Sequence, residues 1–215
     1  MSEYHLVYIH GFNSSPGSFK AQQLEAFVQL NKLAVQVHIP QLSHWPEQAM
    51  GQLTDLLETL SGRVLLIGSS LGGFYSTALL ARYPEIKAVL VNPAVAAHDL
   101  LPAYLGPNEN LYTGEKYQLT LEHMQQLKAL YLSEVVGAER MLVLLQTEDE
   151  TLDYRQAEQY YQNARLEIEL GGNHSFERFE DKLESILQFG DIPYNRPLVK
   201  PDMTAEPGVM AKTDA

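Results

Sequence analysis

No cysteine occurs among the 215 residues of this chain. Disulfide bonds and thiolate metal sites are therefore excluded as sources of stability. A cysteine nucleophile is excluded as well, so any covalent catalytic scheme has to use another side chain.

Long apolar runs and an excess of positive charge are also missing. No stretch approaches the roughly 18 apolar residues that a membrane-spanning helix needs, and the segment MSEYHLVYIH contains no basic region followed by a long apolar one. We therefore expect a cytoplasmic protein without a membrane partner. The 15 lysines and arginines stand against 27 aspartates and glutamates, a formal net charge of −12. Such a field repels polyanions and argues against a nucleic-acid partner.

The composition is that of a folded domain, with 45% hydrophobic and 20% charged residues. No repeat or linker divides residues 1–189, so we expect them to form one domain. From Gly190 onward the apolar periodicity stops, and four prolines punctuate a polar stretch. Residues 190–215 are therefore predicted to form a flexible tail.

Short runs rich in valine, isoleucine and leucine alternate with longer segments of helical period. This alternation predicts βαβ units and an α/β fold with a mostly parallel central sheet flanked by helices. Strands are expected at 5–9, 35–39, 63–68, 88–92, 141–146 and 166–170. Helices are expected at 17–31, 46–60, 71–82, 122–132, 154–162 and 177–189.

Residues 94–117 interrupt this alternation with a long excursion that contains prolines and glycines. We expect it to form a minimal cap over a pocket, with apolar and hydroxylated surface supplied by Tyr104, Leu105, Tyr112 and Tyr117. The alternative is the ordinary packing of a long connection.

The pentad Gly68-Ser69-Ser70-Leu71-Gly72 matches G-x-S-x-G and lies between an expected buried strand and an expected helix. In this context the motif is a nucleophile elbow, in which the serine occupies a strained turn. Side chains two positions before and after the serine would collide, which explains Gly68 and Gly72. The motif therefore predicts Ser70, and not Ser69, as a nucleophile.

A serine hydroxyl needs a base to take its proton, and in α/β hydrolases the chain order is serine, acid, histidine. Three histidines follow Ser70, and His174 fits best because it lies between the last expected strand and the last expected helix. His123 falls inside a helical pattern, whereas His98 lies in the excursion and is a candidate for lining the pocket. The acid must follow a strand between Ser70 and His174. We predict Asp149, with Asp153 as the alternative.

The oxyanion that develops during acyl transfer needs fixed N–H donors. Two donors are predicted, the backbone N–H of Leu71, at a helix N-terminus, and that of Phe12, in the turn after the first strand. His10 in the same turn precedes Ser70 and has no second histidine at metal-ligand spacing, so a catalytic or metal role is not expected. No Walker loop, dinucleotide fingerprint or H-E-x-x-H motif is found, so no metal or cofactor is implied.

Several segments together resemble the YqiA-type small esterases, a bacterial branch of the α/β hydrolases. They span roughly residues 5–189, and GPNENLYTGEKY is far more specific than any serine-hydrolase motif. The others are YIHGFNSSP, IPQL, GSSLGG, VNPAV, LLQTEDETLDYRQA and GGNHSFERFED. The resemblance implies the α/β-hydrolase fold and an esterase for short acyl esters or acyl-CoA thioesters. It also implies a triad of Ser70, Asp149 and His174. One departure is Glu148, where the family usually has glycine.

The leading hypothesis is therefore a serine esterase or thioesterase that hydrolyses a small-molecule ester through an acyl-enzyme on Ser70. The alternative is a catalytically silent binding or scaffold protein that keeps the hydrolase fold.

Overall fold

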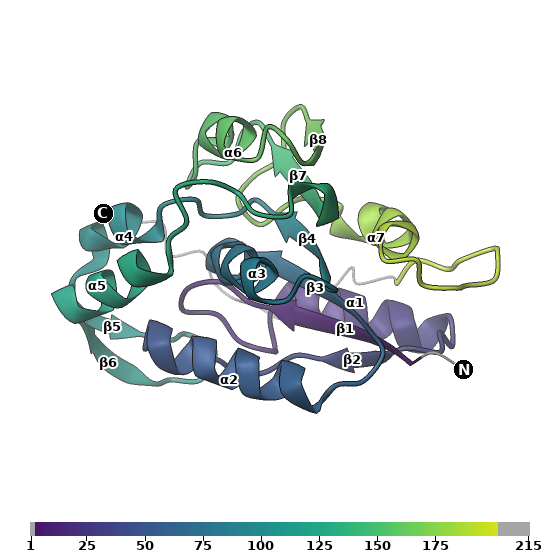
Figure 1. Cartoon of the computed structure of the whole chain (residues 1–215), viewed down its shortest axis with the longest axis horizontal. Helices are drawn as coiled ribbons and strands as arrows, with labels where there is room; N and C mark the ends of the chain where they lie inside the picture. The colour runs from purple at the N-terminus through teal and green to yellow at the C-terminus, as the bar shows by residue number, and fades with distance from the viewer. Residues whose placement is uncertain (1–2, 202–215) are drawn as a thin grey trace.

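A six-stranded parallel sheet forms the centre of the protein, with strand order β2-β1-β3-β4-β7-β8 (Figure 1). The structure is a computed structural model, and it describes residues 3–201. The α/β fold with a parallel sheet is thereby confirmed. The strands are β1 Tyr4–Ile9, β2 Gln36–His38, β3 Arg63–Ser69, β4 Lys87–Val91, β7 Met141–Gln146 and β8 Arg165–Glu169.

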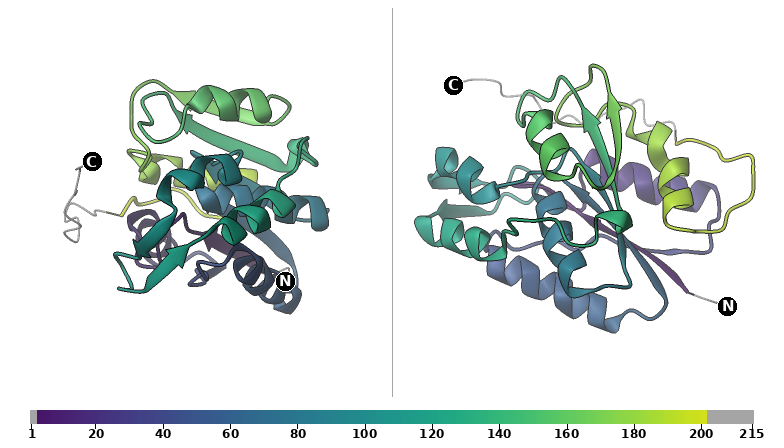
Figure 2. Two further views of the ribbon diagram at one scale, coloured as in Figure 1. Left: turned by 90° about the vertical axis from the view of Figure 1, so that its left-hand side faces the viewer. Right: turned by 45° about the horizontal axis from the view of Figure 1, so that its top comes forward.

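Helices cover both faces of this sheet. Successive side chains of a strand point to opposite sides, so each strand contributes to the packing on both faces. In β1, Val7 and Ile9 pack into the apolar cluster that contains α2, α3 and α6. Leu6 and Tyr8 pack into a second cluster, which contains α1 and α7. The two helical layers lie on opposite sides of the sheet (Figure 2). The helices are α1 Phe19–Leu30, α2 Pro46–Thr59, α3 Leu71–Arg82, α6 Tyr154–Tyr160 and α7 Leu183–Phe189.

The excursion after β4 builds a small cap together with the helix that follows it (Figure 1). It consists of α4 Ala97–Leu100, the 3-10 helix η1 Leu101–Tyr104 and an antiparallel hairpin of β5 Gly106–Glu109 and β6 Lys116–Leu119. Helix α5 Leu121–Leu130 follows and contacts both α4 and α2. The hairpin was not predicted, because GPNE has no apolar alternation, and KYQL, in which Tyr117 and Leu119 alternate with polar residues, is only four residues long.

The expectation of one helix over 177–189 is wrong. Phe176 and Arg178 adopt positive φ values of 61° and 57°, a left-handed conformation that interrupts a helix. A 3-10 turn, η3 Phe179–Lys182, comes first, and α7 starts only at Leu183. The apolar period continues across the break, because Phe179 and Leu183 are both buried in the same cluster.

Residues 190–201 contact the domain at several points. Ile192 is buried, Lys87 Nζ lies 2.7 Å from Asp191 Oδ2, and the Val199 N–H donates to Asn31 Oδ1 at 2.7 Å. The predicted flexibility of the tail stays a prediction. Residues 202–215 lie outside the described residues.

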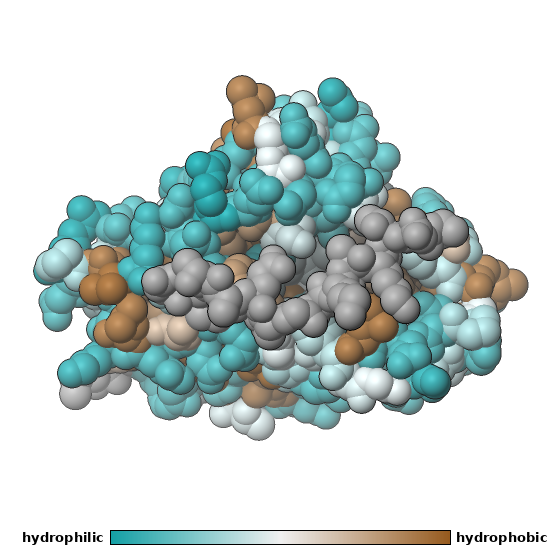
Figure 3. All heavy atoms as spheres, turned by 180° about the vertical axis from the view of Figure 1, so that it is seen from behind, coloured by the Kyte–Doolittle hydropathy of each residue, from teal (hydrophilic) through white to brown (hydrophobic). Residues whose placement is uncertain are grey.

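The face that carries α1 and α7 is largely hydrophilic, with apolar spots scattered over it (Figure 3). Within residues 3–201, no helix is both long enough and apolar enough to cross a membrane.

Two glycines offer a matched test of the packing that positions α3. A Cβ on Gly72 would overlap the carbonyl oxygen of Ile9, whereas a Cβ on Gly51 in α2 would meet nothing within 4 Å. Gly72→Ala is therefore expected to lower the free energy of unfolding by about 3 kcal/mol or more. Gly51→Ala is expected to raise it by about 0.5–1 kcal/mol, because alanine favours the helix. Urea unfolding followed by circular dichroism measures both, and equal effects would contradict the packing argument.

Candidate active site

Ser70 forms the sharp turn between β3 and α3. Its φ of 54° and ψ of −118° place it in a conformation that residues other than glycine rarely adopt. A Cβ on Gly68 would overlap the Ser76 hydroxyl and the Gly72 carbonyl, so the turn has room for glycine alone at that position. The tight turn leaves the Ser70 side chain at the carboxyl edge of the sheet.

His174 lies in the loop after β8, at the same edge of the sheet. Its Nε2 is 3.0 Å from Ser70 Oγ, although the two residues are 104 positions apart in sequence. At this distance the predicted nucleophile and the predicted base form a hydrogen bond.

Asp149 follows β7 and accepts a hydrogen bond from His174 Nδ1, at 2.8 Å through Oδ2 and 3.0 Å through Oδ1. Its side chain is 2% exposed, and Oδ1 also accepts the N–H groups of Thr151 and Leu152. Asp153 instead accepts the Arg155 N–H and caps α6, so it is not the residue that meets His174.

The departure at Glu148 requires no left-handed backbone in the acid loop. Glu148 has a negative φ, which any residue adopts, so the glycine usual in the family is not required for a left-handed backbone here.

The two predicted oxyanion donors line one cavity of about 480 Å³ together with Ser70 and His174. Leu71 is the first residue of α3, so its N–H has no acceptor within the helix. Among the described residues, neither this N–H nor that of Phe12 donates a hydrogen bond. Gly11 lets the turn of Phe12 approach, because a Cβ there would lie 3.2 Å from Ser70 Cβ.

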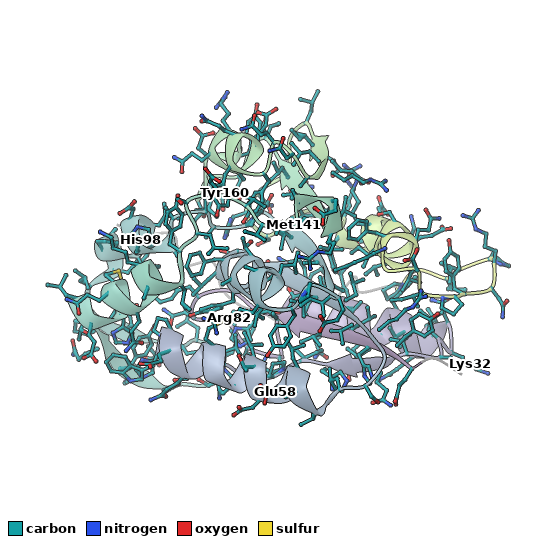
Figure 4. The ribbon with its side chains drawn as sticks, viewed as in Figure 1. Lys32, Glu58, Arg82, His98, Met141 and Tyr160 are labelled. Atoms are coloured by element: carbon teal, nitrogen blue, oxygen red, sulfur yellow. The ribbon has the colours of Figure 1, made fainter. Side chains whose placement is uncertain are left out.

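The remaining histidines do not meet Ser70. His10 is buried, which lowers the pKa of its imidazole, and its Nε2 accepts the Leu42 N–H at 3.2 Å. His123 bonds to Thr120 and His44. His98 lies on α4 (Figure 4) with its ring 5.0 Å from that of Tyr131, and it does not line the cavity. No group of three histidine, aspartate or glutamate side chains within residues 3–201 could hold a metal ion.

Two buried amides hold the loop that carries His174, and the sequence analysis missed both. Asn92, directly after β4, donates to the carbonyls of Asn173 and His174 at 2.9 and 3.3 Å and accepts the Gln146 N–H at 3.0 Å. Gln146 Oε1 accepts the N–H groups of Asn173 and Glu177 at 3.1 and 2.9 Å. The sequence did contain a signal for both residues, since each is a polar residue at the end of an apolar strand.

The hairpin of the cap is hydrogen-bonded to the turn that contains Phe12. Tyr117 donates its hydroxyl proton to Asn13 Oδ1 at 2.6 Å, and Asn13 Nδ2 donates to Asn108 Oδ1 at 3.3 Å. Asn110 Nδ2 donates to the Ser14 carbonyl at 2.8 Å. The cap therefore fixes the position of the turn beside Ser70.

The four residues expected to roof the pocket separate in the structure. Tyr104 lines the 480 Å³ cavity, and Tyr112 lines a second cavity of about 270 Å³ beside Ser70. Tyr117 instead donates its hydroxyl proton to Asn13 in the turn beside Ser70. Leu105 and Tyr117 line neither cavity, so the roofing role expected of both is wrong.

Solved structures of the same architecture define the class as the α/β-hydrolase fold. The chain is similar to mouse alpha/beta hydrolase domain-containing protein 10, with a TM-score of 0.66, 17% identity and coverage of 87% of this chain and 88% of that one. For Est1E from Butyrivibrio proteoclasticus, solved with ferulic acid, the TM-score is 0.66 and the identity 14%, with coverage of 87% of this chain and 88% of that one. For the monoacylglycerol lipase from Paleococcus ferrophilus, the TM-score is 0.62 and the identity 15%, with coverage of 88% of this chain and 95% of that one.

The family is narrower than the fold class. Residues 5–191 match UPF0227, which is described as an uncharacterised protein family. The chain belongs to this YqiA-like family, which confirms the resemblance drawn from its sequence segments.

The hydrogen bond between His174 and Asp149 can be tested without any substrate. A histidine Nδ1–H held by a buried carboxylate gives a strongly deshielded proton resonance in NMR spectra. We expect this resonance in the unmodified protein and in Asp153→Ala, and its loss in Asp149→Ala, because only Asp149 accepts the proton. Circular dichroism checks that both variants are folded. Persistence of the signal in Asp149→Ala would contradict the geometry.

Proposed function

We propose that the protein is a serine hydrolase that cleaves esters or thioesters of small acids through an acyl-enzyme. The observation that carries the proposal is the continuous hydrogen-bond chain from Ser70 through His174 to Asp149, at the wall of a cavity with two unpaired backbone N–H groups. The neighbour from Butyrivibrio was solved with ferulic acid, and another neighbour is a monoacylglycerol lipase. Both names agree with ester chemistry.

The first half of the reaction forms the acyl-enzyme. Ser70 Oγ attacks the ester carbonyl while His174 Nε2 takes the hydroxyl proton, and Asp149 stabilises the resulting imidazolium. The tetrahedral oxyanion accepts hydrogen bonds from the N–H groups of Phe12 and Leu71. Collapse of this intermediate breaks the bond to the alcohol or thiol, which leaves with the proton held by His174.

The second half returns the enzyme to its starting state. Water attacks the acyl carbonyl on Ser70, and His174 takes a proton from the water and passes it to Ser70 Oγ as the acid departs. Each turnover therefore consumes one water and yields one acid and one alcohol or thiol. No cofactor takes part in this scheme.

The 480 Å³ cavity favours an apolar substrate group of short to medium length. Its wall is mainly aliphatic, with Ala94, Ala97, Leu100, Leu101 and Leu152 beside Ser70. Burial of apolar surface there contributes roughly 25 cal/mol for each Å² removed from water.

Replacement of the nucleophile tests the proposal directly. Ser70→Ala is expected to lower kcat for a nitrophenyl ester by about 10³-fold or more and to abolish labelling by a fluorophosphonate, because only an activated serine reacts. Ser69→Ala is the matched control, because Ser69 is the adjacent serine and is not the predicted nucleophile. This variant should still be labelled by the fluorophosphonate. Absence of labelling in the unmodified protein would favour the silent scaffold instead.

Loss of the Tyr117 hydroxyl tests the anchoring of the oxyanion turn. Tyr117→Phe removes the 2.6 Å hydrogen bond to Asn13, the neighbour of Phe12. We expect kcat to fall about 3–10-fold, because a displaced donor stabilises the oxyanion less, whereas KM should change little. Tyr83→Phe, at the far end of α3, serves as the control. A change in KM alone would contradict a role for this bond in transition-state stabilisation.

A further inference from the structure

A second cavity adjoins Ser70 and differs in chemistry from the first. Its volume is about 270 Å³, and its wall includes Ser70, His174 and one lysine, Lys20. The wall contains no aspartate or glutamate. Its other polar side chains include the hydroxyl groups of Tyr8, Ser14, Ser18, Ser69, Tyr112 and Ser175.

Lys20 forms no close ion pair with a carboxylate of residues 3–201, although Asp149, the partner of His174, attracts its charge at longer range. Its Nζ donates to the Ser175 carbonyl at 2.7 Å. An ammonium group has three donors, so two of them have no acceptor among the described residues. Burial lowers the pKa of Lys20 to about 8, which leaves most of the population charged at neutral pH.

The backbone adds to this positive potential. Lys20 lies in the first turn of α1, and Ser18 and Phe19 at the start of the same helix also line the cavity. The Ser18 side chain makes no capping hydrogen bond. Unpaired N–H groups at a helix N-terminus carry partial positive charge, which favours an anion nearby. Lys20 and the helix N-terminus are thus two positive groups in the wall of this cavity, in a chain with a net charge of −12.

Taken together with the proposed ester hydrolysis, on which this inference rests, we propose that Lys20 is a specificity-determining residue that binds a carboxylate of the substrate. The substrate class is then a half-ester or acyloxy acid, with an apolar group in the 480 Å³ cavity and a carboxylate in the 270 Å³ cavity. The cavity is compact and offers one side-chain cation, which suits a monoanionic carboxylate better than a polyphosphate.

Turnover of paired esters tests the inference. Monomethyl glutarate and its amide, methyl glutaramate, place or remove the charge in the acyl half. O-butyrylglycolate and O-butyrylglycolamide do the same in the alcohol half. For at least one pair, the ratio of kcat/KM for the charged over the neutral ester, measured in a pH-stat, should favour the charged ester. The pair that responds identifies the half of the substrate that Lys20 binds.

The variants separate charge recognition from a structural role. Lys20→Met should lower that ratio about tenfold, the loss expected for one charge-assisted hydrogen bond, and Lys20→Arg should retain most of it. Lys32→Met is the charge-matched control and should leave the ratio unchanged, because Lys32 lies beyond the other end of α1 (Figure 4). An unchanged ratio in Lys20→Met, or an equal fall for both esters, would overturn the inference.

Binding measurements keep this inference apart from the proposed reaction. Titration of Ser70→Ala with each charged ester in a calorimeter should show binding that is weakened about tenfold by adding Lys20→Met. Should the unmodified protein hydrolyse none of the four esters, the proposed activity on them would be wrong. Binding that depends on Lys20 would then still support the carboxylate site, and binding that does not depend on Lys20 would refute it.

Discussion

The close approach of two backbones, the β3–α3 turn and the end of β1, is the constraint on which the site depends. Gly72 lies directly against the Ile9 carbonyl, and Gly11 lies against Ser70. Side chains at these glycines would push the turn away from the sheet. Ser70 is further tied to β4, since its N–H donates to the Val91 carbonyl at 3.0 Å and its carbonyl accepts the Ala94 N–H at 3.1 Å. Neighbouring strands thus hold the strained serine in position.

The parallel register extends this constraint to the histidine. Because all six strands of the central sheet end at the same edge, residues at or directly after the ends of β4 and β7 lie near the loop after β8. Asn92 and Gln146 use this position to bind backbone groups around His174. Their bonds are buried, and leaving such a group unpaired costs about 1–3 kcal/mol. The imidazole is therefore oriented by the sheet as well as by Asp149.

Much of this arrangement could be predicted from the sequence, and the missing parts have physical reasons. The apolar period located the central strands and α3, and the strand-to-helix context selected Ser70. Asn92 and Gln146 could not be assigned, because their roles arise from contacts between residues 27 to 82 positions apart. The break before α7 was missed because the apolar period continues across it. The hairpin was missed because GPNE in β5 has no apolar face, and the apolar face of β6 consists of only Tyr117 and Leu119.

The segment from Gly11 to Lys20 links these elements, since each part of it faces a different neighbour. Gly11 contacts Ser70, Phe12 lines the apolar cavity, Asn13 holds the hairpin, and Lys20 lines the polar cavity. The polar cavity adds charge to a site whose other wall is mainly aliphatic. Apolar burial alone discriminates weakly between substrates, because one methylene contributes only about 1–3 kcal/mol. A lysine without a close carboxylate rejects neutral analogues more strongly, since its charge gains no ion pair when they bind. The short segment that carries a predicted oxyanion donor therefore also carries the lysine that we propose selects the substrate.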